Sequence, residues 1–142
     1  MEYKIYGSTV AVRLDKGDEI TESILKLAEK LDISAANVTG IGATDDLTVG
    51  VLDLDTRVYE PYTFTGNHEI NALVGNLTKK DGKPYLHLHI TCTGKGNKVV
   101  GGHLIKAVVS VTGEIFINVL NGGISRAFND AVGINTWDLG SR

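Results

Sequence analysis

The chain has 142 residues, 42% of them hydrophobic and 22% charged, with a formal net charge of −3. These values predict a single globular domain over residues 1–142 with a substantial core. They argue against a nonspecific nucleic-acid binder, because the Lys and Arg residues form no clustered basic run. The lone cysteine, Cys92, excludes an intrachain disulfide and predicts a small buried residue in a reducing compartment. With no signal peptide or bilayer-long apolar run, we expect a cytoplasmic protein.

The first third of the chain predicts a strand, one helix and a second strand. Apolar residues alternate in part from Lys4 to Leu14, as they do in a strand. From Ile20 to Leu31 they recur at helical spacing on one stripe, and Asp18 or Thr21 is expected to cap this helix. A new strand is expected from Val38 to Ile41.

The rest of the chain is predicted to be mostly strand, since β-branched and aromatic residues are frequent in it. The expected strands are Leu47–Leu54, Val58–Phe64, Ile70–Leu77, Leu104–Val111 and Glu114–Leu120. A hairpin turn is expected at Lys80–Lys83 and another around Thr112–Gly113. The tail from Asn121 to Arg142 is only weakly patterned. The sequence therefore predicts an α+β fold, a mainly antiparallel sheet with one principal helix on a face.

Two histidines stand in a strongly alternating segment, Tyr85–Thr91. Three apolar residues of this segment point to one face, and His87 and His89 point to the other. Residues at i and i+2 of a strand lie roughly 6–7 Å apart at Cα, so the two imidazoles can converge on one ion. The same spacing also suits two solvated polar residues on an exposed strand face.

A third histidine strengthens the metal hypothesis. His103 directly follows Gly101 and Gly102, and paired glycines let a backbone approach a neighbour closely. Three histidines with an open fourth position are a ligand set of catalytic zinc sites. The sequence thus predicts that His87, His89 and His103 bind a divalent metal, zinc being the expected ion, and leaves the solvated alternative open.

Other polar residues and glycines have weaker interpretations. Glu69 could point toward the histidines as a base, or could be a solvated charge at a strand end. Arg126 could bind an anion or pair with Asp130, or could lie at the surface on a short helical turn. Gly40–Gly42 looks like the start of a dinucleotide-binding loop, but the third glycine is missing, which favours a turn.

Several segments together resemble the plant and prokaryote conserved (PPC) domain. They are Ala36–Ala43, Glu69–Asn76, His87–His89, Gly101–Leu104 and Thr112–Ile115. The resemblance covers roughly residues 4–139, and His68 departs from it, because relatives more often carry an aromatic residue there. It implies an antiparallel-sheet fold packed as a homotrimer, with a metal held by residues matching the three histidines. Glu69 and Arg126 match polar positions near the same inter-subunit region.

The resemblance also makes DNA a candidate partner, because in plants this domain follows AT-hook motifs in nuclear DNA-binding proteins. The Gly-Arg-Pro core of an AT-hook is absent here, so DNA binding is not favoured. Folding could still gather five lysines on one edge, namely Lys79, Lys80, Lys83, Lys95 and Lys98. Two hypotheses stay open: a metal-binding homotrimer with a small ligand at an inter-subunit cleft, and a DNA-associated module. Whether the chain is an enzyme is also open, with metal-assisted hydrolysis or lyase chemistry as candidate reactions.

Overall fold

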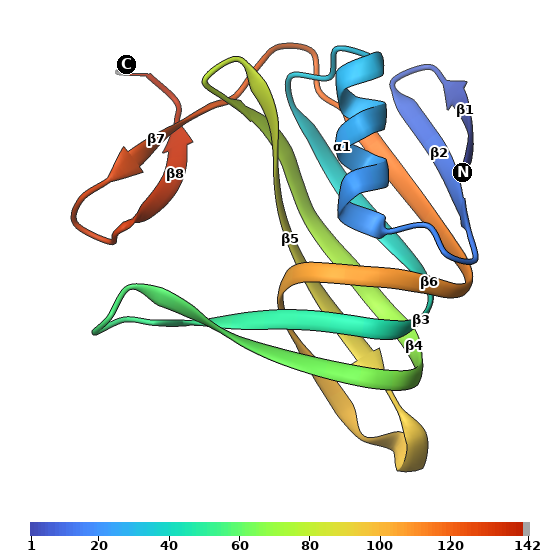
Figure 1. Cartoon of the computed structure of the whole chain (residues 1–142). Coiled ribbons are helices and arrows are strands. Elements are labelled where there is room, and N and C mark those ends of the chain that lie inside the picture. Colours follow the sequence, from blue (N-terminus) through green and yellow to red (C-terminus); the bar gives the residue numbers. More distant parts are fainter. Residues whose placement is uncertain (141–142) are drawn as a thin grey trace.

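One helix packs on a sheet whose long, bent strands make up most of the chain (Figure 1). The computed structural model describes residues 1–140. Its elements in chain order are β1 (Glu2–Tyr6), β2 (Thr9–Asp15), α1 (Ile20–Lys30), β3 (Ala36–Asp53), β4 (Val58–Lys80), β5 (Lys83–Thr93), the short 3-10 turn η1 (Lys95–Asn97), β6 (Val99–Val119), β7 (Ser125–Asn129) and β8 (Ile134–Asp138). The strands pair in the order β1-β2-β6-β3-β4-β7-β8, while β5 pairs with β4 and β6. Apart from one parallel bridge between β4 and β7, these strands run antiparallel, which confirms the predicted sheet.

Three strands, β3, β4 and β6, continue through points where the sequence predicted breaks. The hairpin expected around Thr112–Gly113 is wrong, because β6 continues as one strand from Val99 to Val119. The turn expected at Gly40–Gly42 is wrong as well, because these residues pair with both β4 and β6 inside β3. Gly42 lies opposite Gly113, and a Cβ on Gly42 would collide with the backbone of Thr112. The glycines and the register shifts beside them bend the strands without reversing the chain.

Because it bends, β6 pairs with different strands along its length. Its first residues pair with β5, placing His103 opposite His89, and His103 also lies opposite Gly50 on the far half of β3. After its bend, β6 pairs with the near half of β3 and with β2. Residues far apart in sequence therefore meet around His103.

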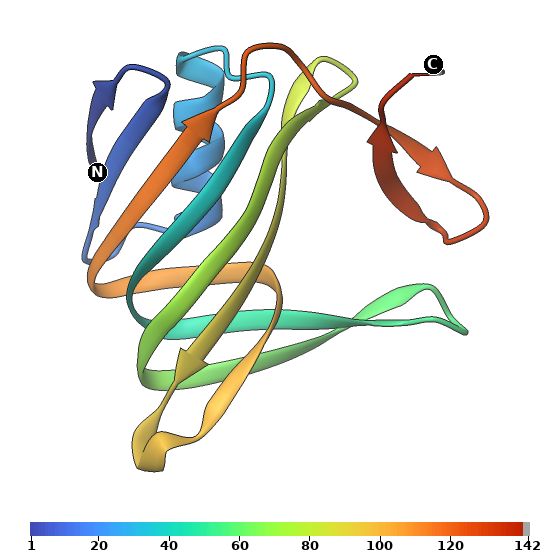
Figure 2. The ribbon, with the colours of Figure 1, turned by 180° about the vertical axis from the view of Figure 1, so that it is seen from behind.

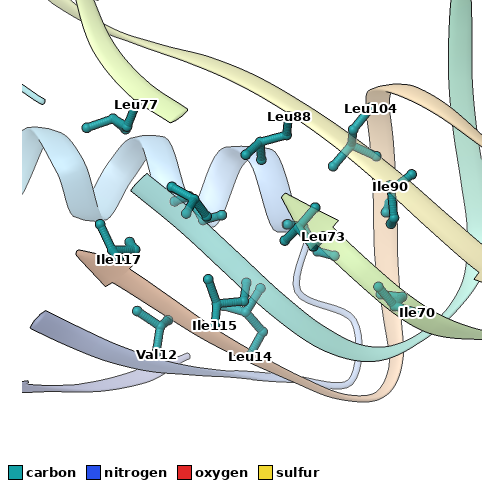
Figure 3. Packing of buried hydrophobic residues seen from close by; sticks show 14 of the residues in the cluster. Val12, Leu14, Ile70, Leu73, Leu77, Leu88, Ile90, Leu104, Ile115 and Ile117 are labelled. Carbon is teal, nitrogen blue, oxygen red and sulfur yellow. The ribbon is translucent and has the colours of Figure 1, made fainter. Parts of the chain in front are cut away.

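The core lies between α1 and one face of the sheet. Leu73, Leu88 and Ile117 are among the large side chains that are almost fully buried there (Figure 3). The helix was predicted correctly from its apolar stripe, but neither predicted cap is used. Glu19 is the N-cap instead: its carboxylate accepts the Glu22 backbone N–H at 2.7 Å and also the Ala107 N–H of β6 at 3.0 Å. This one side chain therefore caps the start of the helix and attaches it to the sheet.

The weakly patterned tail contains a hairpin made by β7 and β8. Arg126 lies on β7, so the short helical turn considered for it is wrong. The end of β3, the start of β4 and the turn between them form a projecting arm. The hairpin stands on the same side of the molecule as this arm (Figure 2). The Arg57 side chain of the arm donates to the Asp130 carbonyl of the hairpin at 3.0 Å. Within residues 1–140, no helix has the length and hydropathy needed to cross a membrane.

Candidate metal centre

The structure brings the three predicted histidines together. One ring nitrogen from each of His87, His89 and His103 lies within 4.8 Å of the others. The Nε2 atoms of His87 and His89 are 3.3 Å apart. Among residues 1–140, these three form the one group of His, Cys, Asp and Glu side chains close enough to share an ion.

Strand alternation and glycine packing position the three rings. On β5, Leu88 and Ile90 are buried against the core, so His87 and His89 project from the opposite face. A Cβ on Gly101 would collide with the Ile90 carbonyl, so the absence of a side chain lets β6 lie close against β5. Both predicted features, the alternation and the role of Gly101, are therefore confirmed by the structure. Gly102 makes a similar approach to β3, where a Cβ would lie 3.0 Å from the Gly50 carbonyl oxygen.

The surroundings keep two of the imidazoles neutral. Burial, with the neighbouring imidazoles of His87 and His89, lowers the pKa of His103 from 6.5 to about 4. Burial also lowers the pKa of His87, with smaller effects from His89 and the Arg126 guanidinium. The buried Nδ1 of His103 has no hydrogen-bond partner among the described residues. A neutral imidazole with a free nitrogen is the form that binds a metal ion.

Arg126 lies behind the histidines in a buried polar network. Its Nε donates to Thr78 Oγ1 at 2.8 Å, and a terminal nitrogen donates to Asn76 Oδ1 at 2.7 Å. The other terminal nitrogen donates to the Asn135 carbonyl at 2.9 Å, and the guanidinium stacks 4.8 Å from the Tyr85 ring centre. Because Asn76 lies opposite His87 in the β4–β5 register, this network supports the strand that carries the histidines.

Glu69 lies apart from this cluster in the chain. It is opposite Thr93, which is four residues along β5 from His89, or roughly 13 Å at the strand rise. Its side chain is exposed. Cys92 is fully buried, as expected, and burial raises the pKa of its thiol to about 11. The thiol therefore stays protonated at neutral pH and packs as a small apolar group.

A small pocket beside the histidines was not predicted from the sequence. Tyr59 of the arm packs against His103 with ring centres 4.6 Å apart, and Phe128 closes the pocket from the hairpin. The aromatic residues of the arm were interpreted only as strand formers, and the tail carried no clear pattern. The pocket forms because the arm and the hairpin, which are distant in sequence, lie close together in space, so local sequence patterns cannot predict it.

The lysines that folding could have gathered lie at two opposite ends of β5. Lys80 pairs with Lys83 where β5 begins, whereas Lys95 and Lys98 lie beyond its end. The 11 residues of β5 separate these groups by roughly 33 Å. Lys79 and Lys80 also pair with Asp32 and Asp81. The single basic edge considered from the sequence is therefore wrong.

The bent sheet, its one helix and the three converging imidazoles define a class of small β-rich proteins with a candidate histidine metal site. The chain belongs to the Plants and Prokaryotes Conserved (PCC) domain family, whose sequence model matches residues 1–121. This confirms the resemblance to the PPC domain drawn from the sequence segments. A comparison with curated proteins gives no match.

Solved structures of three relatives share nearly the whole fold. A metal-containing protein from Archaeoglobus fulgidus is 34% identical, with 96% of each chain covered and a TM-score of 0.86. A protein from Bacteroides thetaiotaomicron, provisionally assigned as DNA-binding, is 31% identical, with 96% of each chain covered and a TM-score of 0.93. A PPC protein from Pyrococcus horikoshii is 26% identical, with a TM-score of 0.87 over 99% of this chain and 97% of that one.

Proposed function

We propose that this PCC-family chain is a homotrimeric protein that binds a divalent metal ion, zinc being the expected ion, through His87, His89 and His103. The observation that carries the proposal is the convergence of three ring nitrogens within 4.8 Å on one sheet face. The unpartnered Nδ1 of His103 and its lowered pKa favour a ligand over a solvated side chain. The description of the Archaeoglobus relative as metal-containing points the same way.

Metal analysis of protein purified without chelators tests the site. Zinc should be present at about one ion per subunit, and the double variant His87→Ala, His89→Ala should lose it while keeping its circular dichroism spectrum. The matched control is His68→Ala, which removes the one histidine outside the cluster. Undiminished zinc in the double variant would contradict the proposal.

Bound zinc with three imidazole ligands supplies a Lewis acid with an open position for water or a ligand oxygen. The chain's own residues orient the ligands, with Arg126 fixing Asn76 opposite His87. Glu69 is proposed as a polar residue of the subunit interface, since in its own subunit it lies too far along the sheet to touch the metal.

The trimer is proposed from the apolar row that leads to the histidines. Register places Phe116, Thr39, Val74 and His89 side by side across four strands, on the face away from α1. The side chains of Phe116 and Val74 are about half exposed, at 54% and 48%, and nearby Ile41 is 57% exposed. A continuous exposed apolar patch of this kind is typical of a subunit interface.

Light scattering tests the assembly. The wild-type protein should give the mass of a trimer, and Val74→Asp with Phe116→Asp should give a monomer, because two carboxylates would be buried in the interface. Lys26→Asp, on the exposed side of α1, introduces the same charge elsewhere and should leave the trimer intact. A monomer mass for the wild-type protein at micromolar concentration would contradict the proposal.

The alternative function is DNA binding, suggested by relatives from Bacteroides thetaiotaomicron and Ralstonia eutropha that are provisionally assigned to it. Binding of duplex DNA needs a cluster of cations on one surface. The separated, partly paired lysines of this chain do not form one. We expect no submicromolar shift of duplex DNA at physiological salt. A salt-dependent shift lost on changing Lys79, Lys80 and Lys83 to Gln would favour the alternative.

A further inference from the structure

The pocket beside the histidines is lined by four separate parts of the chain. The arm, β5, β6 and the β7–β8 hairpin all contribute to its walls, and its volume is about 230 Å³. This is the liquid volume of roughly eight water molecules. Pockets for drug-sized ligands are larger, at roughly 300–1,000 Å³, so this one suits a small metabolite.

The wall chemistry of the pocket favours an anion. Arg57 is the one lining side chain that is always charged, and no carboxylate lines the pocket. A guanidinium has five N–H donors, and among residues 1–140 the Arg57 guanidinium uses one of them, in the bond to the Asp130 carbonyl. The remaining donors are available to a ligand, and a guanidinium binds a carboxylate through two parallel hydrogen bonds.

Arg57 is held in place before any ligand arrives. Its aliphatic stem lies across Gly133, where a Cβ would come within 2.5 Å of Arg57 Cδ. Gly133 also has a φ of +74°, which a residue with a side chain rarely adopts. At the other side of the hairpin, Arg126 bonds to the Asn135 carbonyl. Two arginines thus fix the hairpin over the pocket, and a preformed site lowers the entropic cost of binding.

Three aromatic side chains, Tyr59, Tyr85 and Phe128, line the pocket together with His87 and His103. Tyr59 follows Arg57 by two residues and packs 4.6 Å from the His103 ring, so it connects the guanidinium side of the pocket with the imidazoles. A ligand that fills the pocket therefore needs an anionic end, a flat or apolar body and an end that faces the imidazoles.

We propose that this pocket binds a small carboxylate, with the carboxylate on Arg57, its apolar body between the aromatic rings and its other end facing His87 and His103. The proposal rests on the proposed metal function and deepens it, because it names the class of ligand that the metal meets. It assigns Arg57 as the residue that determines specificity for an anion.

Calorimetric titration with benzoate and with its neutral isostere benzamide tests this assignment. Wild-type protein should bind benzoate at least tenfold more tightly than benzamide. Arg57→Gln should abolish this preference while keeping its metal content, and Arg57→Lys should keep part of it. Lys26→Gln removes one positive charge on α1 and should behave as wild type.

The two proposals fail in different ways. Protein that carries no zinc after purification without chelators, yet prefers benzoate in an Arg57-dependent manner, would contradict the metal function and support the carboxylate site. Zinc-containing protein with equal affinity for benzoate and benzamide, or with a preference that Arg57→Gln does not change, would overturn the carboxylate site alone. Inorganic phosphate that competes as strongly as benzoate would also overturn it.

Discussion

The two faces of the sheet differ in burial: one is covered by α1, and the other is largely exposed. Under α1, side chains such as Leu14, Leu27 and Leu77 are fully buried in the core. On the opposite face, one row across the strands runs from exposed Phe116 to His89 and His103. Because the helix side is buried within one chain, we infer that the fold depends little on the other face, where the metal, ligand and subunit contacts are proposed. The following predictions test that separation.

The largest effect is expected from a cavity on the helix side. Leu27→Ala removes a fully buried side chain of α1 and should lower the free energy of unfolding by about 3 kcal/mol. Urea titration at fixed protein concentration measures this loss. The zinc content of the folded protein should stay unchanged, and a parallel loss of zinc would show that the faces are coupled.

The next effect concerns the polar network that supports the histidine face. Arg126→Met removes the donor to Thr78 Oγ1 and to the Asn135 carbonyl, and leaves Asn76 Oδ1 with only the longer bond from Trp137 Nε1, at a cost of about 2 kcal/mol. Hydrogen exchange should also become faster in the β7–β8 hairpin than in α1. Arg126→Lys keeps the charge and should restore part of the stability. Uniform changes in exchange across both regions would contradict the assignment of a local support.

A pH effect is expected from the histidine face. Burial lowers the pKa of His103 in the fold from 6.5 to about 4, so the unfolded chain binds more protons between these values. The stability of metal-free protein should therefore fall as the pH is lowered from 6.5 to about 4, by about 1–2 kcal/mol once solvent screening is allowed for. Urea titrations across this window measure the slope. His103→Gln should reduce it, and an unchanged slope would contradict the assignment.

The smallest effect is expected at the rim between the faces. The Lys79 ammonium lies 2.6 Å from the Asp32 carboxylate, which is 87% exposed. Lys79→Ala should lower the free energy of unfolding by less than any of the changes above, because solvent screens such a pair. Thermal unfolding at low and high salt measures it. A loss comparable with that of Arg126→Met would mean that this ion pair has a structural role beyond its exposed charge.

Much of the candidate site could be predicted from local sequence. Alternation along Tyr85–Thr91 is enough to separate His87 and His89 from the core, because successive residues of a strand face opposite sides. The glycines before His103 predicted a close approach, and β6 makes it against Ile90. The helix was also predictable, since one apolar stripe at helical spacing has few other interpretations.

The path of the long strands could not be predicted in the same way. Glycines such as Gly42 and Gly113 are compatible both with a turn and with a bend in a continuous strand. Only their pairing across β3 and β6 shows that the strands bend. The hairpin that carries Arg126 was missed for a related reason. Its short strands are stabilised by the buried bonds of Arg126 to β4, and such contacts leave no periodic pattern.

The sequence by itself determined the sheet-rich fold class, the helix and the placing of His87 and His89 on one face of a strand, because these follow from side-chain periodicity along single strands and helices. Only the tertiary structure decided that β6 carries His103 to His89, that Glu69 lies far along the sheet, and that Arg57 meets the hairpin at Gly133. The physical reason is distance along the chain: contacts between residues tens of positions apart depend on where the strands bend. Those bends form through pairing between strands, which no single segment encodes.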